Sequence, residues 1–292
     1  ERNAYSPRLT GEEIYSQIYR FLMRQAEEKK IPVADIDSAR WDSCVASMHG
    51  PVFAEFWYSR AIMPTFSAWV KGDYESVVAL PITKKWGLIP TMRMPLYIKW
   101  LVGEQEFMSI QLKKFWGWRK VFVPFESNGN RHQVQVLKLN SDWAPTKELK
   151  KKIRKCEDEQ YVVSEATWSD FMHMMRDHHP YAWPLVQQQT LHRLYDAARA
   201  RGKGKILGVK KGEQWIALQF FVMSREQVSL IQNVSDSAYR NHDPMTFLLC
   251  SIFNTLKSSA VEMEVNFMGS DHPGVAQYNK KFGAIDQAYW EY

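Results

Sequence analysis

The sequence predicts an α/β (α+β) protein of two tandem lobes, each a mixed, mostly antiparallel sheet flanked by helices, with a helical extension at the N-terminus. Three observations support this prediction. The chain has 292 residues, which is long for one hydrophobic core and comfortable for two. An order of two helices, a three-stranded meander, a helix and a strand is expected twice. A hairpin sequence also recurs in the two halves.

The recurring hairpin is local evidence for an internal duplication. Residues 69–80 read WVKGDYESVVAL, and residues 208–218 read GVKKGEQWIAL. Each segment predicts a strand, a turn at a glycine (Gly72 or Gly212) and a return strand that ends in Ala-Leu. The two copies keep nearly the same offset along both strands. Tandem duplication explains this offset better than a chance similarity of two hairpins.

The predicted boundaries are 1–32 for the extension, 33–145 for the first lobe and 146–292 for the second lobe, which carries the expected site. Thr10 and Glu13 form a capping-box pattern ahead of apolar residues at helical spacing, so the extension is expected to be a helix ending at 29–32. First-lobe helices are expected at 39–48, 53–63 and 105–116, and first-lobe strands at 66–71, 74–83, 96–102, 120–125 and 133–139.

Apolar periodicity and turn residues also predict the elements of the second lobe. Its helices are expected at 147–155, 167–179, 185–201, 244–258 and 273–282. Its strands are expected at 205–210, 214–223, 227–234, 261–267 and 284–291.

The bulk composition excludes several classes of protein. Hydrophobic residues make up 45% of the chain and charged residues 24%, a globular composition without a disorder signature. Cys44, Cys156 and Cys250 are far apart and form no CxxC pair, which argues against a disulfide framework or a zinc site. No apolar run approaches the ~20 residues that span a bilayer. We therefore expect a cytoplasmic protein with no membrane span and no metal.

The densest basic run lies at 147–155, KELKKKIRK. On a helix this run leaves Leu149, Ile153 and Cys156 on one face and surrounds them with charge. The charges are either a solvated helix face or a patch that attracts the phosphates of a nucleotide-bearing substrate or RNA. Charge alone does not decide between these alternatives.

Three stretches carry a resemblance to a known family. They are KKKIRKC at 150–156, YRNHDP at 239–244 ahead of an apolar helix, and FMG at 267–269 followed by GVAQYNKKFGA at 274–284. Together with the element order from about Ala39 to the end, they resemble the FemABX-like tandem GNAT-fold family. The resemblance implies a transferase that moves an acyl or aminoacyl group to an amine. In the best-known members the donor is aminoacyl-tRNA and the acceptor a cell-wall precursor.

The expected start of the helix at 244–258 bears on the cofactor. GNAT enzymes hold the pyrophosphate of coenzyme A at such a helix N-terminus, where backbone N–H groups are free and glycines allow close approach. Here the segment 240–244 has no glycine. Asp243 is expected to cap the helix with its carboxylate and so to repel a phosphate, and Pro244 removes a further donor. We expect that coenzyme A does not bind in the usual way and that no cofactor is used.

The candidate site lies where the strands at 227–234 and 261–267 end, since a splay between them would admit the acyl arm of a donor. Glu262 and Glu264 share one face of the second strand, where they either hold an amine or form a solvated edge. We expect Asn233, Tyr239, Arg240 and Asn266 to bind substrate, and Tyr278 and Lys280 to be catalytic.

Two other functions are compatible with the sequence. The first is a non-catalytic ligand- or peptide-binding protein on a degenerate tandem scaffold. It is suggested by the capped helix and by Asn279, which stands where the family commonly has a lysine. The second is an RNA-associated module that uses the basic helix. For a transferase, the expected partners are an acyl or aminoacyl donor and an amine acceptor; their identity and the oligomeric state stay open.

Overall fold

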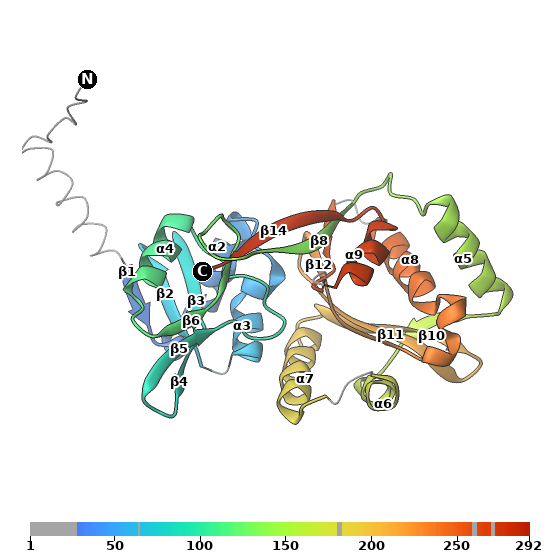
Figure 1. The fold of residues 1–292 in the computed structure, drawn as a ribbon, viewed down its shortest axis with the longest axis horizontal. Helices are drawn as coiled ribbons and strands as arrows, with labels where there is room; N and C mark the ends of the chain where they lie inside the picture. Colours follow the sequence, from blue (N-terminus) through green and yellow to red (C-terminus); the bar gives the residue numbers. More distant parts are fainter. Residues whose placement is uncertain (1–27, 64, 180–182, 259–261, 270–271) are drawn as a thin grey trace, which may run out of the picture.

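A computed structural model describes residues 28–63, 65–179, 183–258, 262–269 and 272–292 (Figure 1). The helix expected near the N-terminus lies outside the described residues. The described chain forms two lobes side by side, one from the blue to green part of the chain and one from the green to red part. It mixes helices with three sheets, which confirms the predicted α/β class. Among the described helices, none is long and apolar enough to cross a bilayer.

The first lobe packs three α-helices and two short 3-10 helices on two three-stranded sheets. The helices are η1 (Val33–Asp35), α2 (Ser38–Ser47), η2 (Val52–Ala54), α3 (Phe56–Ile62) and α4 (Gln105–Lys114). One sheet contains β1 (Glu28–Ile31), β2 (Ser67–Lys71) and β3 (Ser76–Leu80), and the other contains β4 (Ile82–Lys85), β5 (Ile89–Arg93) and β6 (Trp118–Lys120).

Several expectations for this lobe were wrong. The strand expected at 120–125 is split into strands 118–120 and 122–123, and the strand expected at 133–139 lies in the eight-stranded sheet of the second lobe. The strand expected at 74–83 is interrupted at Pro81, whose missing N–H cannot continue the ladder, and becomes β3 and β4. The segment 96–102 is irregular instead of a strand, with Tyr97 in the left-handed region at φ 67°. Residues 28–31, expected to end a helix, form β1 beside β2.

The second lobe is built on an eight-stranded sheet in the order β7-β14-β8-β13-β12-β11-β10-β9. The strands are β7 (Phe122–Val123), β8 (Arg131–Leu139), β9 (Val162–Glu165), β10 (Gly204–Lys211), β11 (Gln214–Met223), β12 (Gln227–Ser235), β13 (Met263–Asn266) and β14 (Ile285–Glu291). The helices are α5 (Lys147–Asp158), α6 (Trp168–His178), α7 (Leu185–Arg199), η3 (Ser237–His242), α8 (Pro244–Leu256) and α9 (Pro273–Lys280).

Both faces of this sheet are covered. On β11, Phe220 and Val222 pack into the core shared with α6 and α7, while Ala217 and Phe221 pack into the core beside α8. This is why β11 has an almost continuous apolar sequence. Figure 1 shows α6 and α7 below the sheet and α8 above it.

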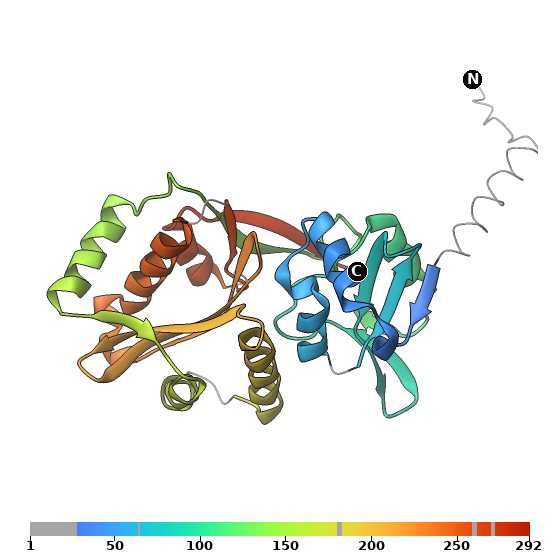
Figure 2. The same ribbon diagram turned by 180° about the vertical axis from the view of Figure 1, so that it is seen from behind.

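The two lobes share strands and a core. β14 leaves the second lobe, passes between β7 and β8, and brings the C-terminus into the first lobe, as Figures 1 and 2 both show. β8 pairs with β13 on its other side. One continuous buried cluster contains side chains of both lobes, with the rings of Trp100 and Tyr289 5.8 Å apart. The lobes are therefore expected to unfold together.

Candidate functional site

Strands β12 and β13 separate near the centre of the large sheet. They pair in parallel over the first three residues of β12, because β13 ends at Asn266 whereas β12 continues to Ser235. A bulge at Ile231 interrupts the pairing of β12 with β11 nearby. Within the described residues, the outer edge of β12 has no strand partner from Leu230 onward. The splay expected from the sequence is therefore present.

A cleft of about 1000 Å³ lies over this open edge. β12, α8 and the chain around α9 line it from the second lobe, and Leu96, Tyr97 and Lys99 line it from the first lobe. His179 and Trp183, next to α7, complete the wall. The cleft thus lies where the lobes meet, and it is large enough for a substrate with a long acyl arm.

The charged side chains of this cleft are cationic. Lys99 and Arg240 line it together with His179 and His272, and no Asp or Glu is among the described lining residues. The Arg240 side chain is exposed, and its guanidinium makes no hydrogen bond or ion pair within the described part of the chain. This charge distribution favours an anionic ligand.

Two buried amide side chains also line the cleft. Gln219 is 1% exposed, and its Nε2 donates to the carbonyl oxygens of Phe220 (2.7 Å) and Gln232 (3.2 Å). Its Oε1 has no hydrogen-bond partner among the described residues, and neither has Nδ2 of Asn279, which is 3% exposed. Because buried polar atoms are nearly always paired, both atoms mark places where a ligand or water completes the structure.

Tyr278 presents the hydroxyl best suited to proton transfer. It projects from α9, and its hydroxyl shares a hydrogen bond of 3.1 Å with Oγ1 of Thr246 in the first turn of α8. Burial raises the pKa of Tyr278 above its ordinary value. A phenol with a raised pKa keeps its proton at neutral pH, so Tyr278 can donate a hydrogen bond and can pass its proton only to a strongly basic atom such as a departing alkoxide.

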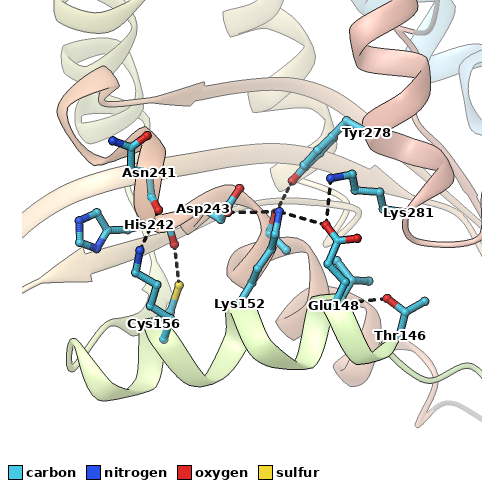
Figure 3. A network of polar contacts seen from close by, with 12 residues as sticks. Thr146, Glu148, Lys152, Cys156, Asn241, His242, Asp243, Tyr278 and Lys281 are labelled. Atoms are coloured by element: carbon cyan, nitrogen blue, oxygen red, sulfur yellow. Dashed lines mark hydrogen bonds and ion pairs between the residues drawn. The ribbon is translucent and has the colours of Figure 1, made fainter.

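The start of α8 differs from expectation in one respect. Asp243 stands at the N-cap with φ 53° and ψ 44°, but its side chain makes no capping hydrogen bond. Its carboxylate instead pairs with Lys152 of α5 at 3.2 Å (Figure 3). The Asp243 carbonyl oxygen accepts from the N–H groups of Thr246 and Phe247. The expected carboxylate cap was therefore wrong, because the lysine of a neighbouring helix holds that carboxylate.

The same interface ties α5 firmly to the α8 start. Lys155 donates to the carbonyl oxygen of Asn241 at 2.9 Å, and Sγ of Cys156 donates to that of His242 at 3.0 Å (Figure 3). The basic helix thus uses two of its cations for packing. Lys147, Lys150, Lys151 and Arg154 remain exposed.

Three of the six candidate residues come together in the cleft. Asn233, Arg240 and Tyr278 line it from β12, η3 and α9. Their assignment as substrate-binding and catalytic residues stays a prediction.

The other three candidates do not line this cleft. The Tyr239 hydroxyl donates to Oε1 of Gln214 at 3.2 Å. Asn266 is buried, and its Oδ1 accepts from the N–H of Met268 at 2.8 Å, which shapes the turn after β13. Lys280 pairs with Asp286 at 2.8 Å, and the Lys280 ammonium lowers the pKa of the Asp286 carboxyl.

Sequence reasoning missed several lining residues. Gln219 carried a signal, because a lone amide inside the apolar run of β11 is the kind of buried polar group that needs an explanation. Tyr97 and Lys99 carried none, since their place in the wall depends on how the first lobe meets the second.

A second cleft, of about 740 Å³, lies at the opposite end of the β12–β13 pair and has a lining of mixed charge, in which carboxylates stand beside Lys138, Lys203 and Arg225. Glu262 and Glu264 both line it, with Asp42 and Glu226. Burial raises the pKa of Glu264, whose Oε1 accepts from Nε2 of Gln227 at 3.1 Å. The two glutamates thus face a second cleft, whose described lining, unlike that of the first, contains carboxylates.

The cysteines offer no nucleophile for acyl transfer. All three are buried, and burial raises the pKa of Cys156 to about 11 and that of Cys250 to about 12. Few thiolates exist at neutral pH with such values. Within the described ranges, no three His, Cys, Asp or Glu side chains gather closely enough to hold a metal ion.

The comparisons with known proteins agree with this architecture. Residues 146–278 match the family model of the acetyltransferase (GNAT) domain. No curated protein matches the sequence. The structure is similar to FemX, with a TM-score of 0.66 and 10% sequence identity over 91% of this chain and 97% of that chain.

Two further solved structures are similar. A tandem GNAT protein from the clavulanic acid biosynthesis pathway has a TM-score of 0.56 and 13% identity, over 91% of this chain and 96% of that one. The L-PGS of Bacillus licheniformis has a TM-score of 0.53 and 11% identity, over 88% and 91%. At these identities the likeness shows the fold, and it confirms the FemABX-like tandem GNAT architecture expected from the sequence.

Proposed function

We propose that this protein, which has the FemABX-like tandem GNAT fold, transfers an activated acyl or aminoacyl group to an amine acceptor. The observation that carries the proposal is the open edge of β12 along the cationic interlobe cleft. An unpaired strand edge offers backbone N–H groups to a carbonyl oxygen, and it does so without needing a charged side chain.

The chemistry requires little of the protein beyond positioning. The acceptor nitrogen attacks the carbonyl carbon of the donor, a C–N bond forms, and the negative charge of the intermediate collects on the carbonyl oxygen. The C–O or C–S bond of the donor then breaks, the nitrogen gives one proton to solvent, and the leaving group takes one from a hydroxyl that solvent reprotonates. We assign donation of that last proton to the Tyr278 hydroxyl, because burial keeps this group protonated.

Three features of the cleft point to the class of donor. Cationic lining without carboxylates favours a donor that carries phosphate. The segment before α8 has no glycine, and the Asp243 carboxylate lies near the helix start, so the usual pyrophosphate cradle of coenzyme A is disfavoured. An aminoacyl ester of RNA meets both requirements, because its phosphates can contact Arg240 from outside the helix terminus.

A non-catalytic binding protein is the second candidate. It is favoured by the absence of any carboxylate base among the described lining residues and by the engagement of Lys280 with Asp286. In that case the cleft binds the same anionic ligand without turnover.

A transfer assay separates these functions. Aminoacyl-tRNA and acetyl coenzyme A are each offered with a mixture of primary amines, and new amides are identified by mass spectrometry. Amide formed from aminoacyl-tRNA alone supports the proposal. Binding of aminoacyl-tRNA without turnover supports the second candidate, and efficient turnover of acetyl coenzyme A contradicts the donor assignment.

Arg240→Ala is expected to raise KM for the phosphate-bearing donor by about tenfold, with little change in kcat. Loss of one charge-assisted hydrogen bond weakens binding of donor and transition state equally. The effect should shrink as salt is added, because Arg240 is exposed. Arg60→Ala removes an exposed arginine of α3 outside the cleft and is the matched control. If the two variants have equal KM values, Arg240 does not bind the donor.

A further inference from the structure

A group of large apolar side chains projects into solvent from the first lobe. We call this group the hairpin patch. It consists of Trp86 (77% exposed), Leu88 (82%), Ile89 (43%), Trp116 (82%) and Trp118 (57%). Single exposed apolar residues are normal on a protein surface, whereas a contiguous group marks a binding surface. Figure 1 shows the β4–β5 hairpin reaching out from the body of the lobe.

Strand pairing places Ile89 and Trp118 on one face of the sheet. β5 pairs with β6 in parallel, with Thr91 opposite Trp118. Ile89 lies two residues before Thr91 and so shares a face of the sheet with Trp118. Gly117 lies so close to Pro90 that an added Cβ would come within 2.0 Å of the Pro90 carbonyl oxygen. This close approach places the backbone between Trp116 and Trp118 against β5 of the hairpin.

The tip of the hairpin is strained without a structural benefit. Residues 86–88 join β4 to β5, with Trp86 (φ 52°) and Gly87 (φ 72°) at the centre of a turn in which the N–H of Leu88 donates to the carbonyl oxygen of Lys85 at 3.2 Å. Such turns prefer Asn-Gly, and a bulky residue at positive φ is unfavourable. The Trp86 ring is exposed, and the Lys85 ammonium lies over it, 4.4 Å from the ring centroid. Packing within this chain therefore does not offset the strain, which indicates a role for the ring outside the chain.

The patch is surrounded by positive charge. The segments 82–93 and 113–120 contain seven Lys or Arg residues and no Asp or Glu. Lys114 pairs with Glu28 and Lys120 with Glu291, but Lys84, Lys85, Arg93 and Lys113 are exposed and make no ion pair within the described residues. Apolar side chains inside a rim of free cations match the chemistry of an anionic lipid surface.

We propose that the hairpin patch docks the protein on an anionic lipid bilayer, with Trp86 and Leu88 entering the headgroup region and the surrounding lysines facing lipid phosphates. A narrow projecting tip cannot enclose a ligand, but it can enter a deformable interface, where tryptophan is the favoured side chain. The proposal does not rest on the proposed function. It does affect that function, because the chain runs from β5 directly to Leu96, Tyr97 and Lys99 of the cleft wall.

Sedimentation with vesicles tests the proposal on the full chain. The vesicles contain phosphatidylcholine and phosphatidylglycerol in a two-to-one ratio, and pure phosphatidylcholine vesicles serve as the comparison. We expect binding to the anionic vesicles and at least tenfold weaker binding to the neutral ones. Trp86→Asn combined with Leu88→Ser should weaken binding by roughly tenfold or more, because each side chain loses its apolar burial in the interface.

Matched variants separate membrane docking from other effects. Leu185→Ser with Val186→Ser removes two apolar residues of α7 that are also exposed. Lys150→Gln with Lys151→Gln removes two exposed cations of α5. Both double variants should bind vesicles as strongly as the wild type does. Lys84→Gln with Lys85→Gln should weaken binding by about tenfold at low salt. Trp86→Asn alone should leave Tm unchanged or raise it, since asparagine suits the turn.

Three results would overturn the proposal. The first is absence of binding to anionic vesicles by the wild-type chain. The second is vesicle binding that is equally strong for the wild type and for all five variants. The third is evidence for another partner. It would be seen if the wild type does not bind vesicles and the Trp86 and Leu88 substitutions abolish self-association or binding to a single-stranded RNA.

Discussion

Tyr278→Phe is expected to lower kcat of acyl transfer by about 10²–10³-fold while leaving KM and Tm nearly unchanged. The substitution removes one hydroxyl and keeps the ring, which packs on Phe282. The hydroxyl lies at the cleft, shares its hydrogen bond with Thr246 and keeps its proton because burial raises its pKa. Steady-state kinetics with aminoacyl-tRNA, together with a thermal melt, measure both quantities.

A matched control distinguishes chemistry from packing. Tyr161→Phe also removes the hydroxyl of a buried tyrosine, one that has no hydrogen-bond partner among the described residues and lies outside the cleft. Its kcat should equal that of the wild type. If Tyr278→Phe also keeps full kcat, the leaving group takes its proton from solvent and Tyr278 only shapes the cleft.

Lys203→Met is expected to lower the free energy of unfolding by about 2–3 kcal/mol, somewhat less than for a fully buried pair because Lys203 is partly exposed. Lys203 precedes β10 in the second lobe, and its ammonium binds the carboxylate of Glu55 in the first lobe. Glu55 is 9% exposed and also accepts from Nε1 of Trp57. The variant leaves this buried carboxylate without its cation, as urea denaturation would show.

Two further variants test whether the loss of unfolding free energy comes from the Lys203–Glu55 ion pair. Lys205→Met removes an exposed lysine two residues away and should change stability by less than about 0.5 kcal/mol. Adding Glu55→Gln to Lys203→Met should restore a large part of the lost unfolding free energy, because the unpaired carboxylate charge of Glu55 disappears. If Lys203→Met costs no more than Lys205→Met, the pair does not hold the lobes together.

Local sequence signals predicted the second lobe well. Thr167 and Asp170 form the capping box that starts α6, and Gly72 and Gly212 turn the two recurring hairpins with positive φ. These elements depend on side chains close to them in sequence, which is why their patterns could be read directly. Both members of the predicted hairpin repeat form, as β2–β3 and β10–β11.

Pairing between distant segments could not be predicted. β14 lies between β7 and β8, and β8 pairs with β13. No local sequence pattern in β8 or β14 indicates which strand it pairs with. The first lobe was less predictable for the same reason. Trp100 and Leu101 are buried in a loop by contacts with other segments, and their apolar sequence was therefore mistaken for a strand.

The candidate site divides along similar lines. Asn233, Arg240 and Tyr278 could be placed because the family resemblance and the strand ends point to them, and the structure gathers them in one cleft. Gln219, Tyr97 and Lys99 depend on the bulge in β12 and on the contact between lobes. The carboxylate of Asp243 was misassigned because its partner, Lys152, lies on another helix.

The most direct test of the central claim is a structure of the protein bound to a non-hydrolysable, amide-linked analogue of aminoacyl-RNA. We expect the acyl carbonyl to lie beside the open edge of β12 between Leu230 and Asn233, with a phosphate next to Arg240. An analogue bound in the second cleft beside Glu262 and Glu264, or bound without any contact to β12, would contradict the proposed function.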